Sequence, residues 1–147
     1  MPNDLQVIYW DASAILSTLF KDSHSERAIA WAEVEGVHFI STLAYSEVCA
    51  VIARMKKDRI LSDPLVSVSY EMLEQGPWRR LTASPEWETQ KSLSEKWSLR
   101  GADLWHLSTS KRLQSEIPEL TLATFDLRLQ KAARAEGFGT ERLLGQP

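Results

Sequence analysis

The stretch Leu5–Ala14, LQVIYWDASA, carries the signal that decides the fold. Its first six residues form a short apolar run with β-branched and aromatic side chains, which is typical of a buried strand. Asp11 follows directly, and helical spacing begins at Ala12 and extends to Phe20. A buried strand that passes straight into a helix predicts the first unit of an α/β fold.

The same alternation of strand and helix continues along the chain. Further strands are predicted at Val37–Ser41, Trp78–Leu81 and Leu120–Phe125, with an edge strand at Phe138–Leu144. Helices are predicted at Ser25–Glu35, Leu43–Lys57, Asp63–Gln75, Ser84–Leu99, Ala102–Ser115 and Leu127–Glu136. Gly36 and Thr42 are expected as helix caps, and Gly101 as a break. This pattern predicts a three-layer α/β/α fold around a central parallel sheet of four to five strands.

Composition narrows the class of protein. The 147 residues contain no repeat, low-complexity tract or Gly/Ser linker, so a single domain over residues 1–147 is expected. A single cysteine, Cys49, excludes an intrachain disulfide and fits the reducing cytoplasm. No segment approaches the ~20 apolar residues of a membrane span. The net charge of −3 argues against holding nucleic acid by bulk positive charge.

Four acidic residues stand out by their contexts. Asp11 follows the first predicted strand, and Asp126 ends the fourth in the motif ATFD. Glu47 lies one turn into a largely apolar helix, in the motif YSEV, and Asp103 begins a helix in the motif RGADLWHL. Ligands of open α/β sheets bind beyond the carboxyl ends of the strands, which is where Asp11 and Asp126 are expected.

Each of these acids also has a purely structural explanation. Asp11 and Asp126 could cap the helices that follow them, and Asp103 could stabilise a helix N-terminus. Glu47 could pair with a nearby basic side chain. Buried carboxylates that converge repel one another, however, and a divalent cation relieves that repulsion. An acidic set without a Cys/His ligand set favours Mg²⁺ or Mn²⁺ over Zn²⁺, and such an ion can activate water and stabilise a phosphoryl group.

These motifs carry a family resemblance. In order, DASA (11–14), SEV (46–48), GADLWHL (101–107) and TFDLRLQKAA (124–133) resemble a PIN-domain ribonuclease of the VapC-like toxin type. The resemblance covers nearly the whole chain. Each motif is short, but their order and spacing within a matching α/β pattern are specific.

The resemblance implies a function and a set of site residues. Asp11, Glu47 and Asp103 would be the core Mg²⁺ or Mn²⁺ ligands, with Asp126 completing the catalytic site. Ser13 and Thr124 match positions that line it. The resemblance further implies cleavage of single-stranded RNA, a homodimer, and inhibition by a small antitoxin protein.

Other residues leave alternatives open. His106 could serve the metal or act as a base, although a packed, hydrogen-bonded histidine is the simpler interpretation. Arg100 could contact a phosphate or be solvated. The same choice applies to two basic runs, Arg54, Lys56, Lys57 and Arg59, and Arg128, Lys131 and Arg134. Of six tryptophans, Trp10 and Trp105 are expected in the core, and Trp31, Trp87 and Trp97 at a dimer or partner surface.

Two other functions compete with the nuclease. One is a phosphatase with Asp11 as nucleophile, although Ser13 stands where that chemistry usually needs a second aspartate. The other is a binding module that keeps the fold without catalysis, against which the intact acidic set argues.

Overall fold

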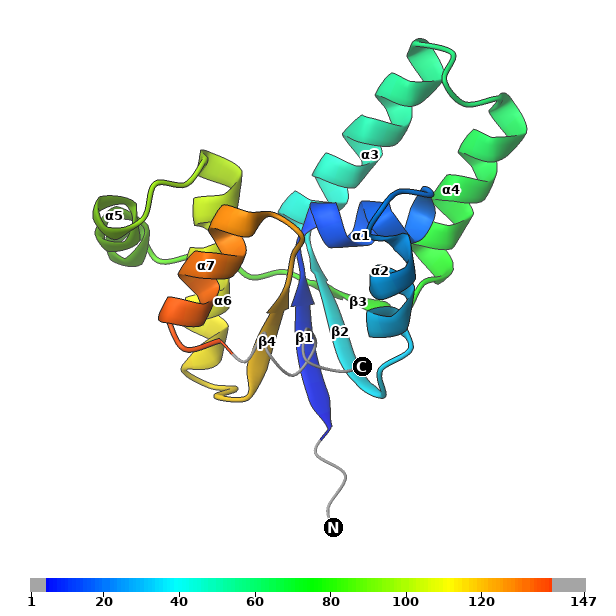
Figure 1. Ribbon diagram of the computed structural model, residues 1–147. Coiled ribbons are helices and arrows are strands. Elements are labelled where there is room, and N and C mark those ends of the chain that lie inside the picture. Colours follow the sequence, from blue (N-terminus) through cyan, green and yellow to red (C-terminus); the bar gives the residue numbers. More distant parts are fainter. Residues whose placement is uncertain (1–4, 139–147) are drawn as a thin grey trace.

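The computed structural model describes residues 5–138 and contains, within that range, four strands and seven helices (Figure 1). The strands are β1 (Gln6–Trp10), β2 (Gly36–Ser41), β3 (Trp78–Leu81) and β4 (Leu120–Ala123). The helices are α1 (Ala12–Leu19), α2 (Ser25–Ala32), α3 (Thr42–Lys57), α4 (Asp63–Gln75), α5 (Trp87–Lys96), α6 (Gly101–Gln114) and α7 (Leu127–Ala135).

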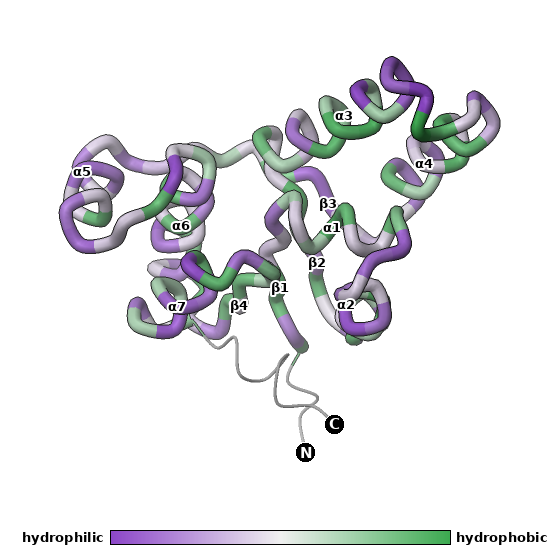
Figure 2. The backbone as a smooth tube through the Cα atoms, turned by 45° about the horizontal axis from the view of Figure 1, so that its top comes forward, coloured by the Kyte–Doolittle hydropathy of each residue, from purple (hydrophilic) through white to green (hydrophobic). Residues whose placement is uncertain are grey.

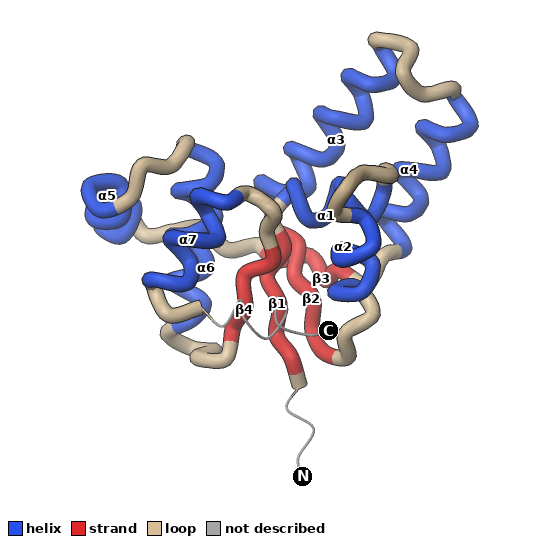
Figure 3. The backbone as a smooth tube through the Cα atoms, in the orientation of Figure 1, coloured by secondary structure: helices blue, strands red, loops and turns tan. Residues whose placement is uncertain are grey.

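The strands form one parallel sheet, as predicted, and their order in it is β3-β2-β1-β4 (Figure 3). β1 is central: Trp10 pairs with Ile40 of β2 on one side and with Ala123 of β4 on the other. The carboxyl ends of β1, β2 and β4 therefore lie at the same edge of the sheet, and the residues that follow them meet there.

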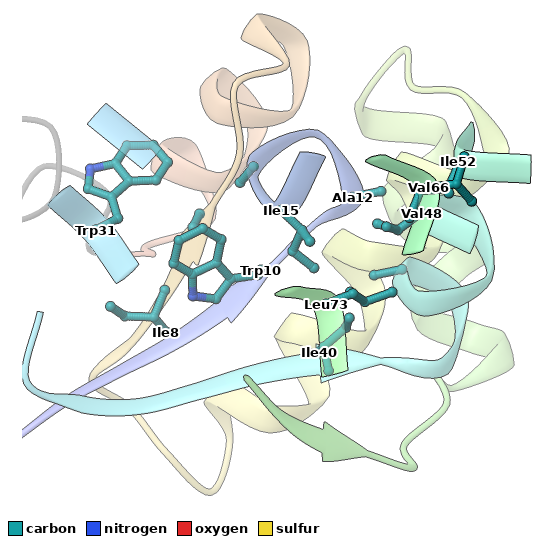
Figure 4. Close-up of a cluster of buried hydrophobic side chains, with 13 residues drawn as sticks. Ile8, Trp10, Ala12, Ile15, Trp31, Ile40, Val48, Ile52, Val66 and Leu73 are labelled. Atoms are coloured by element: carbon teal, nitrogen blue, oxygen red, sulfur yellow. The ribbon is translucent and has the colours of Figure 1, made fainter. Parts of the chain in front are cut away.

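Side chains alternate across β1 and separate the core into two layers. Ile8 and Trp10 point into one cluster with residues of α1, α2, α3 and α4 (Figure 4). Tyr9 points to the opposite face, into a second cluster built from β4, α5, α6 and α7, in which Leu107 and Leu129 are fully buried. Helices thus cover both faces of the sheet, which confirms the predicted three-layer α/β/α architecture.

Several predicted boundaries were wrong for local reasons. β4 ends at Ala123 rather than Phe125, because the backbone N–H of Phe125 donates to Ser13 Oγ and leaves the ladder. Ser41, not Thr42, caps α3, since its hydroxyl accepts from the N–H of Ala44. Gly101 begins α6 instead of breaking the chain. α2 and α5 are shorter than predicted, and the proposed edge strand falls almost wholly outside the described residues.

Gly36 begins β2 rather than ending the preceding helix. Its φ of +152° is unfavourable for residues with a side chain, and a Cβ at this position would lie 2.1 Å from the carbonyl oxygen of Gln6. The absence of a side chain lets β2 approach β1 closely at the start of their pairing.

The tryptophans are distributed differently from the prediction. Trp10 is fully buried as expected, but Trp31 is also in the core, at 3% exposure, where it packs edge-on against Trp10. Trp97 is half-buried and donates to Glu136. Trp87, at 89% exposure, is the expected surface residue.

The hairpin of α3 and α4 extends away from the sheet as an arm (Figure 1). Across residues 5–138, none of the helices is both long enough and apolar enough to cross a membrane.

Candidate active site

Asp11 lies at the carboxyl end of β1 and is almost fully buried, at 3% exposure. Its Oδ1 accepts from the N–H of Ala14 at 2.9 Å, so the residue caps α1, and from Ser13 Oγ at 2.7 Å. Its Oδ2 accepts from the hydroxyl of Thr124. Burial raises the pKa of the Asp11 carboxyl, and these three hydrogen bonds oppose that rise. The carboxylate is therefore fixed in one orientation.

Ser13 and Thr124, the two residues expected to line the site, hold Asp11 and the loop after β4 by hydrogen bonds. Thr124 Oγ1 also accepts from the N–H of Asp126 at 3.0 Å. The hydroxyl of Ser13 accepts from the N–H of Phe125 at 3.1 Å. The two hydroxyls thus join the start of α1 to the segment that carries Asp126.

The ring of Phe125 packs the same loop against α2. It stacks on one side against Trp31, with ring centroids 4.5 Å apart, and on the other against His24 at 4.4 Å, both at an interplanar angle of 9°. Since Phe125 stands between Thr124 and Asp126, this stack restrains both neighbours.

Glu47 lies in the second turn of α3 and its side chain is 34% exposed. Its Oε1 is 2.8 Å from Nε2 of His106 on α6. The other ring nitrogen of His106, Nδ1, is 2.6 Å from the hydroxyl of Tyr9 on β1. Glu47 therefore pairs with a buried histidine, not with a lysine or arginine.

Asp103 lies in the first turn of α6, and Asp126 caps α7, with Oδ1 accepting from the N–H of Leu129 at 2.9 Å. Burial raises the pKa of the Asp103 carboxyl to about 6, and the charges of Asp126, Asp11 and Glu47 contribute to the rise. The nearby His106 opposes the rise. The charges of three of the predicted acids, each from a different segment, thus act on the fourth, Asp103.

The described residues do not form a complete coordination site for a cation. Within residues 5–138, no group of three or more His, Cys, Asp and Glu side chains is arranged so that it could hold a metal ion. The reason is visible in the hydrogen bonds: oxygens of Asp11, Glu47 and Asp126 face protein donors. The donor set itself fits a hard divalent cation, because it consists of carboxylate oxygens whose mutual repulsion such an ion would relieve.

The basic residues are less closely associated with the acids. Arg100 is exposed at the N-cap position of α6, three residues before Asp103. Arg54, Lys56 and Lys57 occupy the last turn of α3, on the arm, and are solvent-exposed. Arg128 and Lys131 are exposed on α7, just after Asp126.

Comparison with known proteins agrees with this arrangement. The family model described as "PIN domain" matches residues 8–135. This range includes all four acids, strands β2, β3 and β4, and β1 from Ile8 onward. The chain belongs to the PIN-domain family. The chain is VapC-like, because it is similar to two proteins from Mycobacterium tuberculosis, Ribonuclease VapC45 (strain CDC 1551 / Oshkosh) and Ribonuclease VapC49 (strain ATCC 25618 / H37Rv). Each is 30% identical over 138 residues, which is 90% of this chain and 93% of the relative.

A solved structure shares the PIN fold. The structure titled "Crystal Structure of FitAcB from Neisseria gonorrhoeae" superimposes with a TM-score of 0.62 and 21% identity, over 87% of this chain and 94% of the other. At that identity the similarity concerns the fold alone.

Sequence reasoning on this PIN domain missed two residues next to the acids. Tyr9 was assigned only to a strand, and its hydroxyl contact with His106 spans 97 positions. Phe125 was assigned to the strand before Asp126 and instead forms the centre of an aromatic stack. His106 was weighed, and the structure agrees with the hydrogen-bonded alternative.

Proposed function

We propose that this PIN domain is a Mg²⁺- or Mn²⁺-dependent endoribonuclease that cleaves single-stranded RNA in the cytoplasm. The observation that carries the proposal is that Asp11 and Asp126 follow the neighbouring parallel strands β1 and β4 at one edge of the sheet, where the charges of both also raise the pKa of Asp103. Two relatives named ribonucleases, each aligned over nine-tenths of the chain, support the choice of substrate class.

Asp11, Glu47, Asp103 and Asp126 are the residues that would hold the cation. When bound, the ion would stabilise charge on the phosphoryl oxygens and make a coordinated water more acidic. The hydroxyls of Ser13 and Thr124 orient Asp11, one of the proposed ligands, by hydrogen bonds. Arg100, exposed ahead of Asp103, is available to pair with a backbone phosphate of the RNA.

The phosphatase alternative is weaker. The hydroxyl of Ser13 donates to Asp11 and cannot act as the second carboxylic acid. A trapped aspartyl-phosphate on Asp11 would reverse this assessment.

The function is tested by incubating the full chain with 5′-labelled single-stranded RNA and Mn²⁺ or Mg²⁺. Asp11→Asn and Asp103→Asn should each lower the cleavage rate by more than roughly 100-fold, because loss of a ligand exceeds the 10–100-fold typical of losing an outer partner. Glu88→Gln, an exposed carboxylate in the first turn of α5, is the matched control and should cleave normally.

Three outcomes separate the candidate functions. Cleavage that needs the metal and both aspartates supports the nuclease. Metal-independent cleavage, or cleavage that survives Asp11→Asn, contradicts it. RNA binding without cleavage at any metal concentration would favour the non-catalytic module.

We further propose that the protein is the toxin of a toxin–antitoxin pair, held by a small antitoxin protein. The VapC-like relatives support this assignment. Expression of the wild-type protein should arrest growth, and co-expression with a short reading frame that adjoins its gene should relieve that arrest. A lack of growth arrest by the wild type would count against the toxin role.

A homodimer is proposed on the exposed face of α4. Leu65, Val68 and Met72, between 42% and 53% exposed, recur at helical spacing along it, and Ile60, in the loop before α4, is 65% exposed. Figure 2 shows hydrophobic, green stretches along α4. The occupant we propose is a second copy of this chain.

A further inference from the structure

Tyr9, His106 and Glu47 form a continuous line of hydrogen bonds that joins three elements. The line runs from the Tyr9 hydroxyl to His106 Nδ1, 2.6 Å apart, and from His106 Nε2 to Glu47 Oε1, 2.8 Å apart. It starts in the sheet on β1, crosses α6 and ends on α3. Tyr9 and His106 are 0% and 1% exposed, so water does not compete for either contact.

The chemistry of the acceptor fixes the direction of these bonds. An ionised carboxylate has no proton to give, so Nε2 of His106 carries a hydrogen and donates to Glu47. In the neutral ring that tautomer leaves Nδ1 as an acceptor, and the Tyr9 hydroxyl donates to it. The imidazole plane is restrained further by edge contacts with Tyr9 and Trp105, at ring-centroid distances of 5.7 and 5.5 Å.

We propose that His106 is a positioning residue for the metal site and that Tyr9 holds it in the required tautomer. This inference rests on the proposed function, in which Glu47 is a metal ligand. Glutamate has a flexible side chain, and this one is one-third exposed, so without a partner it would sample orientations directed toward water. The bond to Oε1 restricts it and leaves Oε2 as the oxygen that turns toward a cation.

The position of His106 adds a second effect. It lies three residues after Asp103 on α6, so the two side chains share a face of that helix. The bond to Glu47 therefore links α3 to α6, the helices that supply two of the proposed ligands. Hydrogen-bond partners of metal ligands typically contribute 10–100-fold to metal affinity.

The test is a Mn²⁺ titration of the full chain, followed by calorimetry or by the EPR signal of free Mn²⁺, without RNA. His106→Leu should weaken Mn²⁺ binding by roughly 10–100-fold. His106→Gln, whose amide can still donate to Glu47, should recover most of the affinity. Tyr9→Phe keeps the ring and removes only the hydroxyl, and should give a smaller loss of several-fold.

A purely structural role predicts a different result, and one control separates the two. His38→Leu also removes a buried, hydrogen-bonded histidine, but His38 contacts Trp10 and Val34 rather than a carboxylate. It should lower stability while leaving Mn²⁺ affinity unchanged. In RNA cleavage, His106→Leu should shift the Mn²⁺ dependence to higher concentration, with an unchanged KM for RNA and recovery at saturating Mn²⁺.

The outcomes distinguish this inference from the proposed function. If Glu47→Gln weakens Mn²⁺ binding but His106→Leu and Tyr9→Phe bind within twofold of wild type, the positioning role is wrong and the metal site stands. If Glu47→Gln and Asp11→Asn both bind Mn²⁺ like wild type, the metal site itself is wrong, and the inference with it. If His106→Leu fails to fold, Tyr9→Phe and His106→Gln still test the positioning role. A Tyr9→Phe variant with the Mn²⁺ affinity of wild type, together with a loss of Mn²⁺ affinity in His106→Gln, would contradict the role of His106 as the donor to Glu47.

Discussion

The hydroxyl of Thr124 donates a hydrogen bond to Oδ2 of Asp11, across 113 positions of the sequence. Thr124 follows β4 and Asp11 follows β1, and the pairing of these neighbouring strands brings the two residues together. A buried carboxylate without donors would be strongly destabilising, so this contact maintains both the fold and the orientation of the proposed ligand.

Thr124→Val should lower the free energy of unfolding by about 1–3 kcal/mol, because it leaves a buried acceptor unpaired while keeping the shape of the side chain. Urea denaturation at pH 7 in EDTA measures the effect. Thr121→Val is the matched control: Thr121 is equally buried on β4, but its hydroxyl has no hydrogen-bond partner within the described structure. An equal loss of stability in both variants would contradict the role of the bond to Asp11.

Asp103 should make the metal-free protein less stable as pH rises. Its folded pKa, about 6, lies above the usual 3.8, so the folded state binds the proton more tightly than the unfolded state does. The resulting stability is present below pH 4 and is lost as pH rises through 6. In EDTA at pH 8, Asp103→Asn should be more stable than wild type by about 1–2 kcal/mol, discounted because the side chain is only half buried.

The matched control for Asp103 is Asp63→Asn, which removes an exposed aspartate from the first turn of another helix, α4. It should not change how stability depends on pH between 5 and 8. Addition of Mn²⁺ at pH 8 should stabilise the wild type more than Asp103→Asn, because a ligand that binds only the folded state raises its stability. Identical pH profiles for wild type and Asp103→Asn would show that the acids do not interact.

His38 should have the opposite pH dependence. The indole N–H of Trp10 donates to His38 Nδ1, so the neutral ring must donate from Nε2 to the carbonyl of Val34. Burial lowers the pKa of His38 below its usual 6.5, and the backbone contact with Val34 opposes that shift only in part. Stability associated with this residue is therefore present above pH 6.5 and is lost as pH falls below it.

The measurement compares wild type with His38→Leu by urea denaturation between pH 5 and 8. The difference in unfolding free energy should be largest at pH 8 and should shrink toward pH 5. A difference that stays constant over this range would mean that His38 titrates alike in the folded and unfolded states.

The exposed face of α4 predicts the oligomeric state. Val68→Glu places a charge at the centre of the Leu65–Val68–Met72 stripe and should convert a dimer to a monomer in light scattering after size exclusion. Trp87→Glu changes an even more exposed apolar residue on α5 and should leave the dimer intact. A wild-type protein that is monomeric at all concentrations would contradict the proposed homodimer.

Much of the fold could be predicted because the relevant signals are local. The apolar run Leu5–Trp10 and the aspartate after it are recognisable without knowledge of distant residues. Errors occurred where two local signals compete, as at Ser41 and Thr42, which are both good caps. Trp31 was expected at a dimer or partner surface, where tryptophan is enriched, yet it is buried in the core, where it packs against Trp10.

The sequence singles out the four acidic residues of the candidate site, but it does not indicate which residues hydrogen-bond to them. Carboxylates at strand ends and helix starts stand out in sequence, although helix capping, which Asp11 and Asp126 also perform, is a second role for them there. The pairs Tyr9–His106 and Glu47–His106 join residues 97 and 59 positions apart, and no spacing rule connects residues on different elements. The same reason hid the fact that oxygens of Asp11, Glu47 and Asp126 accept hydrogen bonds from protein donors.

The acids are divided evenly by the connection between β3 and α5. Asp11 and Glu47 precede residues 82–86, and Asp103 and Asp126 follow them. A chain opened at this connection would give two fragments, neither holding more than half of the carboxylates. Fused to two interacting proteins, such fragments would form a split enzyme whose activity reports that the two proteins have met.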